Sequence, residues 1–355
     1  MHTLNLPACS APLVLMASIV VSLGACGTSV PTSPDPPEPP PTFDYPLDDI
    51  LRLQHLQAKA SHNSYHVAPP DSSLPESNYT HVPLDEQLGK QGVRHLELDL
   101  HYDWDTGEFA VYHTPFFDDS TNCPELTQCL SVIKAWSDAH RAHHPITVQL
   151  DIKDPAQSAA TIEGYFDALH AAILSVWPAD RILTPDEVQG AYPTLRDAVK
   201  TEGWPVLGAL RGRILFTLYN LHDSFGDAYT HGETSLAGRM IFARAATADD
   251  PYAAIVHVDD PVALSDAISS LISANMLVRT HADALMVEPL ANDTSRLDVA
   301  LSTGAQFIAT DVPGPVDGLE YWVDIPGGTP SRCNPVLAPA ECTSAAVEDP
   351  GFVGP

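Results

Sequence analysis

The segment Gly92-Val93-Arg94-His95-Leu96-Glu97-Leu98-Asp99-Leu100-His101 decides both the fold and the site of this chain. Its leucines alternate with polar residues, which is the two-residue period of a β-strand. One face is therefore leucine, and the other carries two carboxylates and two imidazoles. Alone, this pattern is also typical of an edge strand with a solvated polar face. Two neighbouring segments, Ser-His-Asn-Ser-Tyr at 61–65 and Phe-Ala-Val-Tyr-His at 109–113, carry similar side chains and indicate one shared site.

Composition limits the classes of partner. The chain has 355 residues, enough for one large domain or two ordinary ones. Its formal net charge of -29 argues against a nucleic-acid partner, because phosphate binding needs clustered Lys and Arg. The same charge should weaken attachment to anionic membranes unless a cation bridges protein and phosphate.

The six cysteines divide by position. Cys9 lies in the apolar N-terminal segment, and Cys26 closes Leu-Gly-Ala-Cys, which resembles a bacterial lipobox. The other four form two local pairs, and we expect two small disulfide loops, which join Cys123 to Cys129 and Cys333 to Cys342. A zinc site is the alternative, but neither pair has the short spacing of a Cys-x-x-Cys motif.

Four regions follow along the chain. Residues 1–26 are expected to be a signal peptide with a lipobox, since the apolar run at 13–21 is too short to span a bilayer. We further expect a Pro-rich linker at 27–43, the main folded domain at 44–330, and an irregular tail with a disulfide loop at 331–355. Lipidation of Cys26 would make an exported lipoprotein, anchored at the cell surface or in the periplasm. An ordinary secretory signal is the alternative.

Strand-like and helical segments alternate through the body of the chain. Strands are predicted at 56–61, 92–100, 109–113, 146–152, 214–219, 241–246, 284–289 and 305–310. Helices are predicted at 127–143, 157–176, 194–202, 262–278 and 293–303. This order implies βαβ units and predicts an α/β fold, a single TIM-type (β/α)₈ barrel. A doubly wound open sheet is the alternative, but no GxGxxG-type loop follows the first strand.

Chemistry in such a barrel gathers where the strands end. Residues of this kind stand at the ends of five predicted strands: His62 and Asn63, Glu97 and Asp99, His113, Asp151 and Lys153, and Asp311. We therefore expect one site at that end of the barrel.

Four of these residues offer only oxygen. Asn63, Glu97, Asp99 and Asp151 together suit a hard divalent cation, Ca²⁺ or Mg²⁺. Any one of the acids could instead cap a helix or pair with a basic residue. Convergent acids would repel each other without a cation, which favours a metal site for the group.

Two histidines complete the set. His62 and His113 each follow a strand and can take or give a proton near neutral pH. A cation with two such histidines suits phosphodiester cleavage, in which one imidazole protonates the leaving group.

Several segments resemble the catalytic X region of phosphoinositide-specific phospholipase C. They are Ser-His-Asn-Ser-Tyr at 61–65, Leu-Glu-Leu-Asp at 96–99, Val-Tyr-His at 111–113 and Val-Gln-Leu-Asp at 148–151. Later segments, at 277–283 and 304–311, resemble the small Ca²⁺-dependent bacterial branch of that family. One departure is Asp151, where the animal enzymes usually carry Glu.

The resemblance implies a TIM barrel with Ca²⁺ held by Asn63, Glu97, Asp99 and Asp151. It also implies cleavage of phosphatidylinositol at a membrane surface, to diacylglycerol and a cyclic inositol phosphate that is then hydrolysed. His113 is then the general acid for the leaving glycerol oxygen, and His62 a donor to the phosphoryl oxygen.

The first general base and the groups that contact the substrate each have two alternatives. Glu97 or Asp151 would serve as the first general base, and Lys153 and Arg279 would contact phosphate or inositol, or else form structural salt bridges. No protein partner is implied, and we expect a monomer.

Three alternatives stay open. A glycerophosphodiester phosphodiesterase or sphingomyelinase-D-like enzyme shares a barrel, a metal and two histidines, but such families open with a His-Arg-Gly element in place of His62-Asn63. A non-catalytic surface lipoprotein would be expected to lack a member of the constellation. A polysaccharide hydrolase would use the carboxylates and leave the histidines without a role.

Overall fold

The computed structural model describes residues 43–70, 74–155, 158–219, 223–328 and 330–354. The predicted signal peptide, Cys26 and the linker up to residue 42 lie outside these described residues. From Phe43 onward the chain forms one compact unit.

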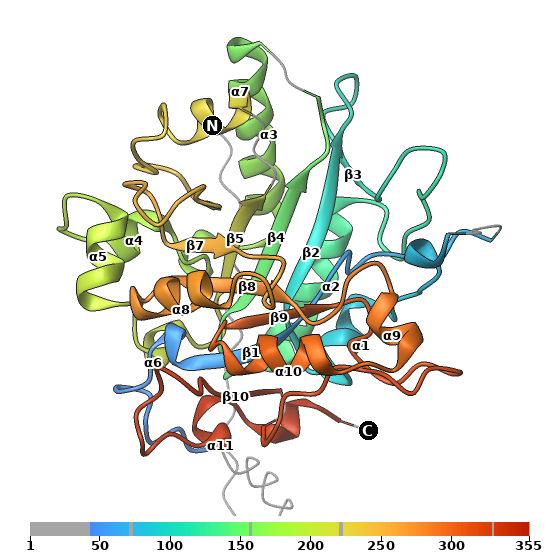
Figure 1. The fold of residues 1–355 in the computed structure, drawn as a ribbon. Helices are drawn as coiled ribbons and strands as arrows, with labels where there is room; N and C mark the ends of the chain where they lie inside the picture. The colour runs from blue at the N-terminus through green and yellow to red at the C-terminus, as the bar shows by residue number, and fades with distance from the viewer. Residues whose placement is uncertain (1–42, 71–73, 156–157, 220–222, 329, 355) are drawn as a thin grey trace, which may run out of the picture. The chain divides into compact units, whose positions relative to one another are not determined.

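Eight parallel strands build the centre of this unit, in the order β6-β5-β4-β2-β1-β9-β8-β7 (Figure 1). They are β1 Leu56–Ser61, β2 Val93–Tyr102, β4 Ile146–Ile152, β5 Ile214–Tyr219, β6 Phe242–Ala243, β7 Ile255–His257, β8 Leu277–His281 and β9 Phe307–Thr310. A parallel bridge between Arg244 and Ile255 joins the two outer strands, so the sheet closes on itself. The predicted (β/α)₈ barrel is confirmed, and the doubly wound open sheet is excluded.

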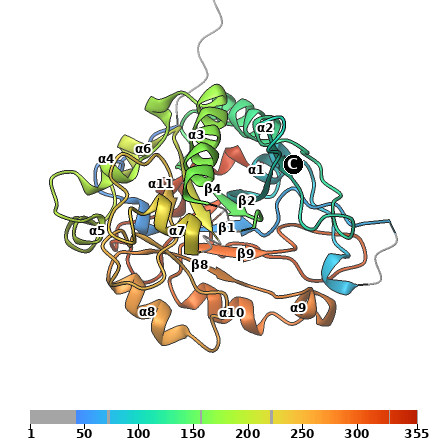
Figure 2. The ribbon, with the colours of Figure 1, turned by 90° about the horizontal axis from the view of Figure 1, so that it is seen from above.

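Helices surround the strands, as the view from above shows (Figure 2). They are α1 Leu84–Gly89, α2 Leu126–Ala139, α3 Ala159–Val176, α4 Pro185–Gln189, α5 Leu195–Glu202, α6 Leu207–Leu210, α7 Asp223–Tyr229, α8 Ser265–Ser273, α9 Val287–Ala291, α10 Ser295–Ser302 and α11 Ser344–Val347. Among the described residues, no helix combines the length and the apolar character needed to cross a membrane.

The predicted strand at 284–289 is wrong. Leu285 and Met286 adopt φ angles of 52° and 58°, in the left-handed region, and this turn leads directly into α9. The barrel instead includes β7 and β8, both of which the sequence prediction missed. The predicted helix 262–278 is too long, because α8 ends at Ser273 and β8 begins at Leu277.

The predicted strand at 109–113 is not a barrel strand. Its ordered part, β3 (Phe109–Val111), pairs antiparallel with the end of β2, with Leu100 opposite Val111. The β2–β3 hairpin therefore extends beyond the barrel. Because β3 runs antiparallel to β2, the loop that follows β3 lies again near the end of the barrel where the strands terminate.

The C-terminal residues, expected to be irregular, cover the other end of the barrel. Strand β10 (Ser331–Cys333) pairs antiparallel with the start of β1, and Glu348 accepts a hydrogen bond from buried Arg94 at 2.7 Å. Glu348 also accepts the backbone N–H of His144, just before β4, at 2.8 Å. Both predicted disulfides, Cys123–Cys129 and Cys333–Cys342, are present.

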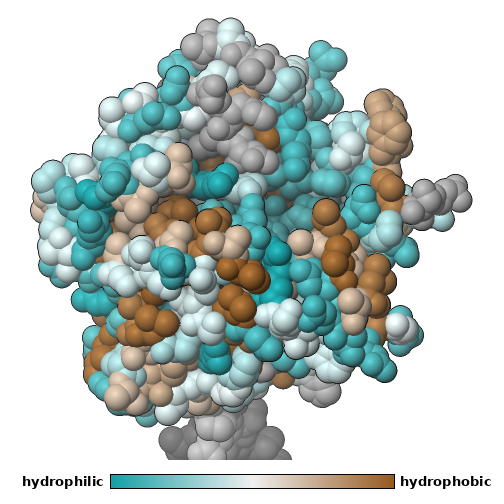
Figure 3. All heavy atoms as spheres, viewed as in Figure 1, coloured by the Kyte–Doolittle hydropathy of each residue, from teal (hydrophilic) through white to brown (hydrophobic). Residues whose placement is uncertain are grey.

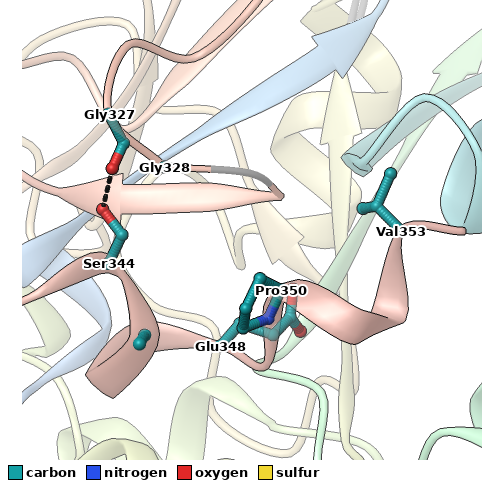
Figure 4. A pocket seen from close by; sticks show the side chains of 7 residues that line it. Gly327, Gly328, Ser344, Glu348, Pro350 and Val353 are labelled. Atoms are coloured by element: carbon teal, nitrogen blue, oxygen red, sulfur yellow. Dashed lines mark hydrogen bonds between the residues drawn. The ribbon is translucent and has the colours of Figure 1, made fainter.

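A hollow of about 610 Å³ lies within this C-terminal cover (Figure 4). Its lining is Gly327, Gly328, Ser344, Ala345, Glu348, Pro350 and Val353. The Ser344 hydroxyl donates to the Gly327 carbonyl at 2.7 Å, and the Glu348 carboxylate is occupied by Arg94. The hollow is thus a structural feature at the end of the barrel away from the predicted site.

Candidate active site

Strand β2 carries the centre of the site. Leu96, Leu98 and Leu100 belong to the hydrophobic core, while Glu97 and Asp99 alternate with them and are also buried. Strand β2 pairs with β1 on one side and with β4 on the other, so the edge-strand alternative is wrong.

Three carboxylates form a compact cluster. Asp99 lies opposite Asp151 in the β2–β4 register, and ligand oxygens of Glu97, Asp99 and Asp151 all lie within 4.8 Å of one another. Burial and the nearby charge of Asp151 raise the pKa of Asp99 to about 8. Oxygen donors of this kind suit Ca²⁺, and a bound cation would favour the ionised form of all three carboxylates.

The predicted fourth ligand, Asn63, follows β1. Its Oδ1 accepts a hydrogen bond from the Tyr65 hydroxyl at 3.2 Å, and its Nδ2 donates to the Tyr79 hydroxyl at 3.3 Å. Burial, followed by the charge of Asp99, raises the pKa of Tyr65 well above its usual range. An amide oxygen and carboxylates are donor types that Ca²⁺ takes, and Asn63 as the fourth ligand stays a prediction.

The segment after β1 is tied to β2 by Ser64. The Ser64 hydroxyl accepts the backbone N–H of Glu97 at 2.8 Å, and the Ser64 N–H donates to the Glu97 carbonyl at 3.0 Å. Asn63 itself has a φ of 45°, a left-handed conformation that Asn tolerates better than most residues. These contacts hold Asn63 next to the strand that carries Glu97.

Both predicted substrate-contacting bases lie among the acids. The Lys153 ammonium lies 2.6 Å from Asp151 Oδ2 and 3.0 Å from Asp99 Oδ2. Arg279 is buried, forms an ion pair with Glu97, and has Nη1 2.9 Å from His281 Nε2. In the described structure these side chains balance the acidic cluster, as the salt-bridge alternative expects.

His62 lies in the mouth of the barrel, where its side chain is partly exposed. Its Nδ1 lies 2.7 Å from Asp311 Oδ1, at the end of β9. Burial acts to lower the pKa of His62, but the charges of Asp311 and Glu97 outweigh it and raise the pKa to about 9. These contacts favour the protonated imidazole, which suits stabilisation of a charged phosphate oxygen.

His113 lies at the base of the loop that follows β3, also partly exposed. Its Nδ1 lies 3.0 Å from Asp118 Oδ2, and the other oxygen of Asp118 lies 2.8 Å from Nε2 of buried His66. Burial lowers the pKa of His113, and the bond to Asp118 acts in the opposite direction. A histidine poised in this way can exchange a proton with a substrate.

Three acidic residues behind the histidines gain roles from the structure. Asp311 was placed at a strand end without a function, and Asp118 and Asp283 were not singled out. Asp283 accepts the backbone N–H of Asp311 and the hydroxyl of Tyr321, each at 3.0 Å. His113 and Asp118 are only five residues apart in the sequence. No spacing rule identifies such a pair, so the sequence alone did not reveal the contact.

Comparison with known proteins identifies the family and the fold. A family model described as phosphoinositide phospholipase C, Ca²⁺-dependent, matches residues 51–115 and 109–335. No curated protein matches the chain.

Two similar solved structures share the fold. The Ca²⁺-dependent phosphoinositol-specific phospholipase C from Pseudomonas sp. has 18% identity and a TM-score of 0.56, with 76% of this chain and 93% of that chain covered. The Ca²⁺-dependent phosphatidylinositol-specific enzyme from Streptomyces antibioticus has 20% identity and a TM-score of 0.55, with 74% and 95% covered. Because the family model spans most of the barrel, the chain belongs to the Ca²⁺-dependent phosphoinositide phospholipase C family.

Proposed function

We propose that this chain cleaves phosphatidylinositol-type phospholipids to diacylglycerol and an inositol phosphate, with a cyclic phosphate as intermediate. The observation that carries the proposal is the buried cluster of Glu97, Asp99 and Asp151, flanked by two partly exposed histidines that each have a carboxylate partner. One polar set can thus bind a cation, receive a phosphate and move protons.

Bond changes in the first step involve the substrate's own hydroxyl. The inositol 2-hydroxyl attacks the phosphorus, and the bond from phosphorus to the glycerol oxygen breaks. His113 gives its proton to the leaving glycerol oxygen, and a carboxylate of Glu97 or Asp151 receives the proton of the attacking hydroxyl. His62 donates to the phosphoryl oxygen as negative charge grows there.

The second step reverses the direction of proton transfer. His113, now neutral, takes a proton from water, whose oxygen bonds to the phosphorus as the bond from phosphorus to the inositol 2-oxygen breaks. The carboxylate that received a proton in the first step returns it to that 2-oxygen. Bound Ca²⁺, held by Asn63, Glu97, Asp99 and Asp151, would supply positive charge at the phosphate and acidify the attacking hydroxyl.

We further propose that the chain is exported and anchored through acylated Cys26, and that it acts as a monomer. The lipobox-like sequence supports the anchor, and one chain supplies every residue of the site.

The experiment that tests the function measures products from phosphatidylinositol vesicles, with Ca²⁺ and then with excess chelator. Ca²⁺-dependent release of diacylglycerol and cyclic inositol phosphate is expected. Cleavage of glycerophosphodiesters or sphingomyelin instead would keep the site and change the substrate. Absence of turnover on all three would favour a non-catalytic lipoprotein.

His62→Ala and His113→Ala provide the matched variants. Each should lower turnover by ~10²–10⁴-fold with folding intact. Near-normal turnover in either variant would overturn the mechanism.

A further inference from the structure

The loop that follows β3, residues 112–123, carries a proposed catalytic group and is weakly packed at its tip. His113 lies at its start and Cys123 at its end. The outer part of the loop stands clear of the barrel in the ribbon and in the space-filling view (Figures 1 and 3), and Phe116 and Phe117 at its tip are 93% and 82% exposed. The position of the loop therefore depends on the contacts at its base.

A disulfide holds the end of this loop. The backbone N–H of Val111, the last residue of β3, donates to the carbonyl of Pro124 at 2.9 Å and so brings the two ends of the loop together. Cys123 precedes Pro124, and its disulfide joins it to Cys129 on α2. The start of the loop is thus held by β3 and its end by α2.

Contacts next to Cys123 reach the segment that follows β1. Asn122 donates its backbone N–H to the Tyr65 carbonyl at 2.8 Å, and its Nδ2 donates to the His81 carbonyl at 3.4 Å. The Nε2 of His81 lies 2.8 Å from the His62 carbonyl. A change in the position of Cys123 therefore reaches the segment that carries His62.

A second route leads back to His113. Asp118, five residues before Cys123, has one carboxylate oxygen 3.0 Å from His113 Nδ1 and the other 2.8 Å from His66 Nε2. The backbones of His66 and Thr121 also pair in an isolated antiparallel bridge. The acid that orients His113 therefore lies between two points of attachment, the pairing with His66 and the disulfide.

We propose that the Cys123–Cys129 disulfide positions His113, so that the chain is active in an oxidising compartment and loses activity when this pair is reduced. The inference rests on the proposed function, in which His113 protonates the leaving glycerol oxygen, and it adds a redox condition to that step. Oxidation joins the two sulfurs and releases two electrons and two protons, which a small-molecule disulfide accepts as it becomes two thiols. A compartment rich in thiols keeps the pair reduced and the enzyme poorly active.

Burial makes reduction of this pair disruptive. Cys123 is 2% exposed and Cys129 is 0% exposed. Two thiols need more space than a disulfide, and a close-packed interior does not offer it. Reduction therefore moves Cys123 away from α2 and carries the end of the loop with it. A misplacement of about 1 Å at a catalytic group lowers the rate by ~100-fold.

The other disulfide provides an internal control. Cys333–Cys342, here called the C-terminal disulfide, lies in the cover at the opposite end of the barrel, where Cys333 pairs with Leu56 at the start of β1. Both of its cysteines are partly exposed. We expect a mild reductant to open the C-terminal disulfide first, with no effect on turnover.

Titration of the full chain with dithiothreitol tests this order. Cys9→Ser and Cys26→Ser are present in every sample, so that only the two disulfides respond. Dithiothreitol gives two electrons and two protons to each pair as its own sulfurs join in a ring, and alkylation with peptide mass spectrometry identifies the opened pair. Turnover on phosphatidylinositol vesicles should fall ~10- to 100-fold as Cys123–Cys129 opens. Full turnover with this pair open would overturn the proposal.

Paired variants separate positioning from a general loss of stability. Cys123→Ala/Cys129→Ala should lower turnover on phosphatidylinositol, while Cys333→Ala/Cys342→Ala should leave it unchanged. A 4-nitrophenyl phosphodiester of inositol has a leaving group that needs no proton, so the loss on this substrate should be about tenfold smaller. An equal loss on both substrates, or an equal loss in both variants, would overturn the role of the disulfide in positioning His113.

Hydrogen–deuterium exchange gives a readout that does not depend on the substrate. The backbone N–H groups of Asp118 and Asn122 donate to carbonyls within and next to the loop. Both should exchange about tenfold faster or more in Cys123→Ala/Cys129→Ala, while those of β4 stay unchanged. Unchanged exchange at both groups would overturn the proposal whatever the substrate is. Faster exchange, with a parent protein that does not cleave phosphatidylinositol, would support the attachment of the loop and overturn the proposed function alone.

Discussion

His113 Nδ1 lies 3.0 Å from Asp118 Oδ2, while His66 Nε2 occupies the other oxygen of the same carboxylate. A carboxylate at Nδ1 favours the tautomer in which Nδ1 carries a proton, and this leaves Nε2 of His113 for the substrate. Buried His66 in turn keeps Asp118 in place. The proposed general acid is therefore oriented by a bridging acid from its own loop.

Asp118→Asn should lower turnover on phosphatidylinositol by ~10- to 100-fold, as loss of orientation weakens general acid catalysis. Asp118 raises the pKa of His113 against the effect of burial, so its loss should lower that pKa further. The protonated form is then lost at lower pH, and the alkaline limb of the kcat profile should move to lower pH. Ser77→Ala, which removes another hydrogen bond to Asp118 Oδ2, serves as the control and should have a small effect. An unmoved alkaline limb in Asp118→Asn would contradict this role.

Asp311→Asn should lower turnover because the Asp311–His62 contact of 2.7 Å orients the imidazole. We expect a loss of ~10- to 100-fold, smaller than that of His62→Ala. Since Asp311 acts through His62, the double variant should be no worse than His62→Ala alone. Kinetics of the two single variants and the double variant measure this coupling, and additive losses would show that Asp311 acts independently.

Asp99→Asn should remove most of the stabilisation that Ca²⁺ gives to the fold. Ca²⁺ that binds the acidic cluster raises the free energy of unfolding by about 3 kcal/mol at a hundredfold excess over Kd. Thermal melts with and without Ca²⁺ should therefore show a rise in Tm for the parent protein and little rise for Asp99→Asn. Asp119→Asn, an exposed acid outside the cluster, should retain the full rise. An equal rise in Asp99→Asn would place the cation elsewhere.

Glu348→Ala should destabilise the protein without a direct effect on the site. Arg94 and Glu348 are both fully buried, and Arg94 also lies 4.6 Å from the centre of the Trp136 ring. Removal of one partner leaves a buried charge uncompensated, at a cost of about 3–5 kcal/mol. Urea unfolding measures this loss, with exposed Glu341→Ala as the control. Turnover per folded molecule should stay normal, and a loss in urea below about 1 kcal/mol would contradict the assigned contact.

The sequence predicted the barrel because its first strands are long and strongly patterned. Strands β2 and β4 carry alternating or continuous apolar residues over most of their length, and their boundaries agree closely with the prediction. The later half was harder, since β7 has only three residues and its strand conformation depends on neighbours. The apolar run around Leu285 looked like a strand, but it is exposed and begins a helix.

The site was predictable to the extent that its residues sit on those patterned strands. Glu97, Asp99 and Asp151 converge because parallel strands in register end at the same edge of the sheet. Asp118 was not predictable, because an irregular loop places it beside His66 and His113. Loop conformations of this kind are set by tertiary contacts and not by sequence periodicity.

Arg94 on β2 and Glu348 near the C-terminus are 254 residues apart. During synthesis, every barrel strand leaves the ribosome before the residue that neutralises Arg94. A shorter nascent chain would have to bury an unpaired guanidinium or keep that end of the barrel open. Long-range contacts of this kind form late and slow the folding reaction. We therefore expect the barrel to complete its folding only after the C-terminal segment has been synthesised.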